Sequence, residues 1–220
     1  MGILVKICGI NSAEAADAAA RAGADLAGLV FHSHSPRHLS LDAARSLADR
    51  LRGRSRLVAL VADADDETIA AVVAAVQPHY LQLHGRETPA RVRQIRARFA
   101  RPLIKAVAIA DDADVAASAA YEDAADMLLF DAKAPDGAAR PGGHGAPFDW
   151  QLLRGRTCRR SWLLAGGLNP GNVARAIAAS DAPGVDVSSG VESAPGVKDI
   201  QMIADFVSAV RSARYAEARS

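Results

Sequence analysis

The chain has 220 residues, half of them hydrophobic, which suits a single domain over residues 1–220 with a substantial core. Its net charge of +1 gives no electrostatic reason to expect binding to nucleic acid or to a membrane surface. No apolar run approaches the roughly 18 residues of a membrane span, no secretory signal is visible, and the distant Cys8 and Cys158 form no disulfide pattern, so a cytoplasmic protein is expected.

Short apolar runs alternate with alanine-rich or amphipathic segments along the chain. The apolar runs predict strands over 3–7, 24–31, 57–62, 80–83, 103–108, 127–130, 162–165 and 185–187. The intervening segments predict helices over 12–21, from residue 40, and over 65–76, 89–99, 112–119, 148–153, 170–178 and 199–213. The expected N-caps are Asn11 or Ser12, Ser40 and Asn169. A glycine- and proline-rich loop is expected over 131–147.

The strict alternation of about eight strand–helix units determines the expected fold. Such units imply a parallel sheet, and eight of them at this length favour a closed (βα)8 barrel, the TIM barrel of the α/β class, over an open sheet. In such barrels the active site lies where the strands end. Polar or glycine residues follow most of the predicted strands at that point, namely Cys8, 32–37, Asp63, His84, Gly85, Asp131, Gly166, Gly167 and 188–190.

Two stretches near the C-terminus, LAGGLNPGNV and GVDVSSGVE, indicate a phosphate site. In each, a strand ends in small residues that let backbone N–H groups approach an anion. They fall in the loops after the seventh and eighth strands, where barrels commonly bind phosphate. Each supports the other, although a glycine pair alone would indicate only a tight turn.

Cys8 and Asp131 are the candidate base and acid. A thiolate is a competent base once its pKa is lowered, and Lys6, on the same strand face, could favour it. Asp131, at the end of a buried strand, could serve as a general acid. The alternatives are an inert core thiol for Cys8, and an N-cap or an ion pair with Lys133 for Asp131.

Arg37, ahead of the helix that begins at residue 40, has the forked guanidinium that suits a substrate carboxylate. The alternative is a surface salt bridge. The histidines, including His32, His34 and His38, show no metal-binding spacing, so no metal site is expected.

Seven motifs follow one another in order: VKICGI, SPRHLS, LQLHG, LLFDA, GGHGAPFDW, LAGGLNPGNV and GVDVSSGVESAPGVKD. In this order, over nearly the whole chain, they closely resemble the phosphoribosylanthranilate isomerase family of tryptophan biosynthesis. The resemblance implies a (βα)8 barrel without cofactor or metal. It also implies an Amadori rearrangement that converts N-(5-phosphoribosyl)anthranilate into 1-(2-carboxyphenylamino)-1-deoxyribulose 5-phosphate.

By the same resemblance, Cys8 matches the general base, Asp131 the general acid, and Arg37 the residue that would hold the anthranilate carboxylate. The backbone groups that match the phosphate site belong to Gly166, Gly167, Ser189 and Gly190. The residues expected to line the substrate or to lie in the loop after the sixth strand are Lys6, His84, Gly143, His144 and Gly145. The resemblance does not decide whether His84 lines the substrate site or has a structural role.

One motif departs from the family, whose loop usually reads close to GGTGKTFDW. Here His144 stands where threonine is common, and Ala146 and Pro147 replace a basic residue and its neighbour. We expect altered affinity or turnover rather than a new reaction.

Two other kinds of function stay open. One is another phosphate-binding barrel isomerase or lyase; the related histidine-pathway isomerase uses two aspartates, whereas the first strand here ends in cysteine. The other is a catalytically silent barrel that binds phosphosugars or a partner enzyme. The expected partner is a small phosphorylated substrate, and the expected state is a monomer, with a homodimer as the alternative.

Overall fold

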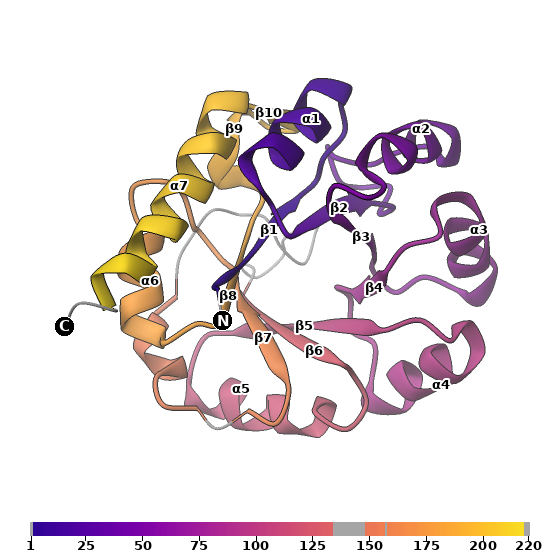
Figure 1. Cartoon of the computed structure of the whole chain (residues 1–220). Helices are drawn as coiled ribbons and strands as arrows, with labels where there is room; N and C mark the ends of the chain where they lie inside the picture. Colours follow the sequence, from indigo (N-terminus) through magenta and orange to yellow (C-terminus); the bar gives the residue numbers. More distant parts are fainter. Residues whose placement is uncertain (1, 134–147, 157, 218–220) are drawn as a thin grey trace.

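Eight parallel strands close into a barrel in the computed structural model, which describes residues 2–133, 148–156 and 158–217. Each strand is hydrogen-bonded to the next in chain order, and β8 pairs with β1 (Figure 1). The predicted (βα)8 barrel is therefore confirmed. The strands are β1 Leu4–Cys8, β2 Leu26–Val30, β3 Arg56–Val61, β4 Tyr80–Leu83, β5 Leu103–Ile109, β6 Met127–Ala132, β7 Ser161–Leu164 and β8 Gly184–Val187.

Helices form an outer ring around the strands (Figure 1). The described α-helices are α1 Ala13–Ala22, α2 Leu41–Leu51, α3 Asp66–Val76, α4 Pro89–Phe99, α5 Asp112–Ala117, α6 Val173–Ser180 and α7 Ile200–Glu217. The same described residues include three short 3-10 helices, η1 Ser118–Tyr121, η2 Trp150–Leu153 and η3 Ser189–Val191. The last helix, α7, packs against both α1 and α6 and so completes the ring.

The helices begin where the sequence offers a capping side chain. Ser12 and Ser40 each accept a hydrogen bond from the N–H three residues ahead, as predicted. The predicted helix over 170–178 with Asn169 as its cap is wrong at its start, because α6 begins at Val173. Asn169 instead accepts from the Gly171 N–H within the preceding loop.

Three further differences concern the ends of elements. Asp131, placed in a loop by the sequence, still belongs to β6. The helix predicted over 112–119 ends at Ala117 and continues as η1, and the helix predicted over 148–153 is only the 3-10 turn η2. A hairpin that the sequence did not predict, with strands β9 Glu192–Ala194 and β10 Val197–Lys198, lies between β8 and α7.

Side chains alternate between the two faces of each strand, and this alternation divides the core. Outward-facing apolar residues pack beneath the helices in one large cluster. The interior of the barrel holds a separate cluster of Leu26, Val58, Ile104, Ala106, Met127, Leu129, Leu163 and Ala165. A third group, Cys8, Val30 and Leu60, lies at or next to the C-terminal ends of its strands. Cys8 therefore lies at the mouth of the barrel.

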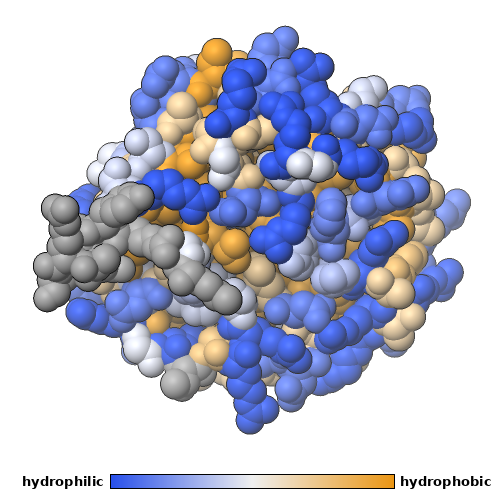
Figure 2. Space-filling model, in the orientation of Figure 1, coloured by the Kyte–Doolittle hydropathy of each residue, from blue (hydrophilic) through white to orange (hydrophobic). Residues whose placement is uncertain are grey.

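Polar residues cover most of the face seen in Figure 2. The large apolar side chains that are exposed in the described part are Leu41, Val197 and Ile200. Among the described helices, none has the length and apolar character needed to span a membrane.

Candidate active site

Cys8 is the last residue of β1 and is buried, with 4% of its surface exposed. Gly28 is its partner in the register of β2, and a Cβ built on Gly28 would lie 3.0 Å from the Cys8 Sγ. The missing side chain on β2 therefore leaves the space that the thiol occupies.

Two lysines and one aspartate set the charge around this thiol. Lys6 is fully buried, and its Nζ lies 2.8 Å from Oδ1 of Asp186 on β8. Burial raises the pKa of Cys8; the charge of Lys6, and more weakly that of Lys198, opposes the rise, while Asp186 adds to it. Because the pKa is raised overall, the neutral thiol is favoured in the free protein. Lys6 acts in the predicted direction, but burial outweighs it.

Asp131 lies near the end of β6 with its side chain 14% exposed. Its Oδ1 accepts the N–H of Ala132 at 2.9 Å, and its Oδ2 lies 3.4 Å from Nε2 of His84. The amide nitrogen of Gln82 lies 2.8 Å from the other ring nitrogen of His84. If the amide donates that bond, His84 carries its proton on Nε2 and presents it to Asp131. A polar chain from β4 thus ends on the candidate acid.

The ion pair between Asp131 and Lys133, one of the sequence alternatives, is absent from the described contacts. Lys133 instead lies 3.7 Å from a carboxylate oxygen of Asp114. The carboxylate of Asp131 is therefore free of a lysine partner among the described residues and keeps part of its surface open at the mouth.

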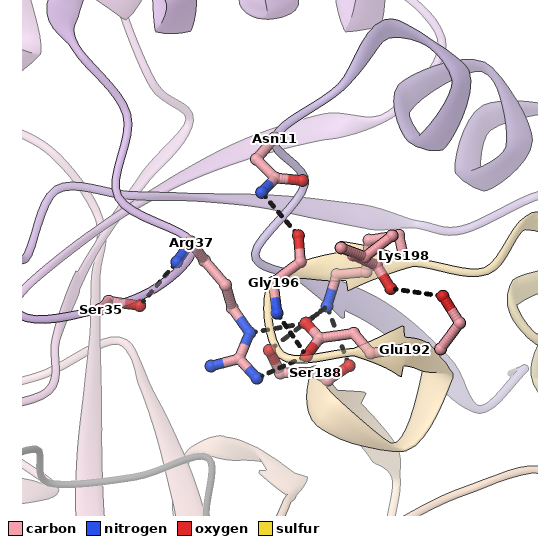
Figure 3. A network of polar contacts seen from close by, with 9 residues as sticks. Asn11, Ser35, Arg37, Ser188, Glu192, Gly196 and Lys198 are labelled. Carbon is pink, nitrogen blue, oxygen red and sulfur yellow. Dashed lines mark hydrogen bonds and ion pairs between the residues drawn. The ribbon is translucent and has the colours of Figure 1, made fainter.

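Arg37 lies in the loop after β2 and is 5% exposed. Its Nε donates to Oε1 of Glu192 at 2.6 Å and its Nη2 to Oε2 at 2.8 Å, a two-pronged pair visible in Figure 3. The stem of Arg37 passes over Gly9, where a Cβ would overlap the Arg37 Cδ. The alternative of a surface salt bridge is wrong, because the ion pair is buried. The Nη1 group has no hydrogen-bond partner among the described residues.

The loops after β7 and β8 meet as the phosphate prediction requires. Gly166 and Gly167 have φ values of +86° and +66°, which glycine adopts readily. Gly190 packs so tightly on the carbonyl of Leu168 that any Cβ would overlap it. Within the described part of the chain, no backbone acceptor pairs with the N–H groups of Gly166, Gly167, Ser189 and Gly190. These free donors at adjoining loops suit an anion.

Contacts join some of the predicted residues into neighbourhoods. Gly9 brings Arg37 beside the end of β1, and a Cβ on Gly166 would lie 3.2 Å from Oδ1 of Asp131. The predicted loop residues Gly143, His144 and Gly145 lie outside the described residues. No cluster of three or more His, Cys, Asp or Glu residues in the described part is arranged to hold a metal ion.

Sequence reasoning missed four residues of this region: Gln82, Asp186, Glu192 and Lys198. Alternation would have identified two of them. Gln82 lies two residues before the predicted His84, and Asp186 lies two residues before Ser188 at the end of the eighth predicted strand, so each shares a strand face that leads to the barrel mouth. Glu192 and Lys198 belong to the hairpin, where no periodic pattern indicates the direction of a side chain.

Comparison with known proteins gives a consistent result. The model of the family "N-(5'phosphoribosyl)anthranilate (PRA) isomerase" matches residues 5–209. The N-(5'-phosphoribosyl)anthranilate isomerase of Bradyrhizobium sp. (strain ORS 278) is 51% identical over 213 residues, which are 97% of each chain.

The fold of this chain is similar to those of two crystal structures of phosphoribosyl anthranilate isomerase. The structure from Thermotoga maritima has a TM-score of 0.86 and 36% identity, over 96% of this chain and 99% of the other. A second, in complex with reduced 1-(o-carboxyphenylamino)-1-deoxyribulose 5-phosphate, has a TM-score of 0.83 and 34% identity over the same shares. With this coverage, and with the barrel and its mouth as described, the chain belongs to the phosphoribosylanthranilate isomerase family.

Proposed function

We propose that this chain converts N-(5-phosphoribosyl)anthranilate into 1-(2-carboxyphenylamino)-1-deoxyribulose 5-phosphate in tryptophan biosynthesis, with Cys8 as general base and Asp131 as general acid. The observation that carries the assignment of roles is the pairing of a thiol and a carboxylate at the same end of one barrel, on β1 and β6. Family membership supplies the reaction.

The first step opens the sugar ring. Asp131 donates a proton to the ring oxygen, the bond between that oxygen and C1 breaks, and the nitrogen lone pair forms a C=N bond to C1. The product is a protonated Schiff base, and Asp131 is left as the carboxylate. His84, 3.4 Å from Oδ2, orients Asp131 and stabilises the charge that it acquires.

The second step moves hydrogen from C2. The Cys8 thiolate removes the C2 proton, and the electron pair of that bond forms a C1=C2 bond while the iminium nitrogen becomes a neutral amine. The resulting enolamine then gives its C2 hydroxyl proton to water and takes a proton from water at C1, which gives the ketose. Proton exchange with solvent returns Cys8 to the thiolate and Asp131 to the acid. The positive charges of Lys6 and Lys198 offset part of the effect of burial on the thiol and so favour the reactive thiolate.

Binding is proposed to use both ends of the substrate. Arg37 takes the anthranilate carboxylate through the guanidinium edge that Glu192 leaves free. The N–H groups of Gly166, Gly167, Ser189 and Gly190 take the phosphate. The single domain over residues 1–220 belongs to this proposal, and the oligomeric state stays a prediction.

The test is a fluorescence assay of phosphoribosylanthranilate consumption, coupled to indole-glycerol-phosphate synthase so that product is removed. We expect turnover by the wild type, and a fall of at least about a hundredfold in Cys8→Ser and in Asp131→Asn, with folding retained by circular dichroism. Cys158→Ser is the matched control and should keep full activity, because Cys158 lies outside the mouth.

Two outcomes would contradict the proposal. If the wild type binds phosphate but does not turn over this substrate, a silent barrel or another phosphosugar becomes the better assignment, and GGHGAP is the first stretch to examine. If both variants keep normal turnover, the reaction stands but the acid and base are other residues.

A further inference from the structure

Glu192 is the most highly connected side chain beside the candidate active site. It begins the hairpin of β9 and β10, and 3% of its side chain is exposed. Its carboxylate accepts from Nε and Nη2 of Arg37, from Nζ of Lys198 at 2.7 Å and from the N–H of Gly196 at 3.1 Å (Figure 3). Burial alone would raise the pKa of Glu192, but the hydrogen bonds and charges of Arg37 and Lys198 together lower it by more. The pKa is therefore below its usual value, and Glu192 is ionised at neutral pH.

Burial lowers the pKa of Lys198, and the charge of Glu192 opposes that fall. With both cations protonated, the cluster of Arg37, Glu192 and Lys198 carries two positive charges and one negative charge. Among the described contacts, neither cation touches a second carboxylate. One unit of positive charge therefore remains at a largely buried place, which is unfavourable unless an anion completes it. This excess charge suits a ligand carboxylate beside Arg37.

The direction of the free donors follows from the shape of the guanidinium group. Its five N–H bonds form a rigid planar fork, and Glu192 occupies the edge formed by Nε and Nη2. The opposite edge, formed by Nη1 and the second N–H of Nη2, is left for a ligand. Because the fork is planar, the orientation of the Glu192 carboxylate fixes the direction in which this edge points.

The hairpin that carries Glu192 is itself held against three loops of the barrel mouth. Asn11, after β1, donates to the carbonyl of Gly196 at 2.8 Å. Gly196 has φ +80° and packs on the loop after β2, where a Cβ would lie 2.6 Å from the carbonyl oxygen of Pro36. Lys198 donates to the carbonyl of Ser188, after β8, at 2.8 Å. The same hairpin therefore contacts the neighbour of Arg37 and the loop expected to hold phosphate.

We propose that Glu192 is a positioning residue for substrate recognition: it holds Arg37 with one guanidinium edge facing the substrate carboxylate, and the hairpin sets this edge at a fixed distance from the phosphate loop. This inference rests on the proposed function, since it needs a substrate that carries both a carboxylate and a phosphate. Glu192 does not touch the reacting atoms and takes no proton in the reaction.

The test compares two ligands that differ by one group. The first is reduced 1-(o-carboxyphenylamino)-1-deoxyribulose 5-phosphate, and the second is the same compound without the ring carboxylate. Binding is measured by calorimetry for the wild type and for Glu192→Gln, whose uncharged amide cannot accept both fork bonds. We expect Glu192→Gln to bind the carboxylated ligand at least about tenfold more weakly, as the loss of charged hydrogen bonds implies, and the decarboxylated ligand about equally well.

Glu87→Gln is the matched control. Glu87 is another buried glutamate paired with a buried lysine, Lys105, at 2.8 Å, but it supports the loop after β4. Its substitution should lower the melting temperature without changing the ratio of the two affinities. If Glu192→Gln does not fold, Glu192→Asp keeps the charge but shortens the reach, and it should show the same selective loss at smaller size.

The possible outcomes distinguish the positioning role of Glu192 from the proposed carboxylate-binding role of Arg37 on which it rests. If a folded Glu192 variant binds both ligands equally weakly, or binds both as the wild type does, the positioning role is refuted. If the wild type itself does not distinguish the two ligands, the carboxylate role of Arg37 fails first. Selective loss in Glu192→Gln, with the ratio unchanged in Glu87→Gln, supports the inference.

Discussion

The buried ion pair beneath Cys8 gives the sharpest prediction, because it links stability to chemistry. Replacing Lys6 by methionine keeps most of the side-chain volume but leaves Asp186 charged, 7% exposed and without the partner that lies 2.8 Å from it. Removing one member of a buried pair typically costs about 3–5 kcal/mol. A domain commonly has about 5–15 kcal/mol of stability, so Lys6→Met should fold but unfold at a clearly lower urea concentration.

The double variant Lys6→Met/Asp186→Asn separates the two effects. Removing the second charge should recover more than half of the lost free energy of unfolding, since no buried charge is left unpaired. Activity should recover only in part: Asp186→Asn removes a charge that raises the pKa of Cys8, but the larger opposing effect of Lys6 is still missing. A loss below about 1 kcal/mol in Lys6→Met would refute the energetic reasoning, and full activity in the double variant would refute a role for Lys6 in the chemistry.

Three further predictions concern the base, the phosphate site and the acid. Since burial raises the pKa of Cys8, alkylation of this thiol by iodoacetamide, measured in a Cys158→Ser background, should become about tenfold faster per pH unit from pH 7 towards 9; a rate independent of pH would contradict the raised pKa. Gly190→Ala places a Cβ against the Leu168 carbonyl and should raise KM at least about tenfold. In Gly171→Ala the added Cβ would meet only the Asn169 side-chain oxygen, at 3.3 Å, so KM should not change; equal effects of the two substitutions would exclude a specific phosphate loop. His84→Ala removes the neighbour of Asp131 Oδ2 and should lower kcat by roughly tenfold while the reduced product analogue binds as before; unchanged kcat would leave His84 only a lining role.

Much of the architecture was predictable because it depends on local patterns. The alternation of apolar runs and amphipathic segments predicted the barrel, and its strand ends brought Cys8, Asp131 and the glycines of the last two loops to one mouth. The start of α6 was wrong because Asn169 and Asn172 bond within the loop, and Asn172 donates to the carbonyl of Gly167. Such side-chain bonds compete with helix formation and leave no periodic trace.

The sequence by itself determined the fold class, the order of the elements and the residue types proposed as acid, base and anion-binding groups. Only the tertiary structure decided that Arg37 is clamped by Glu192, that Lys6 is paired with Asp186, and that His84 faces Asp131. Strand periodicity fixes which face a side chain takes, and that information is local. Pairing between residues 155 or 180 positions apart depends on how the barrel closes, and local sequence patterns do not encode that closure.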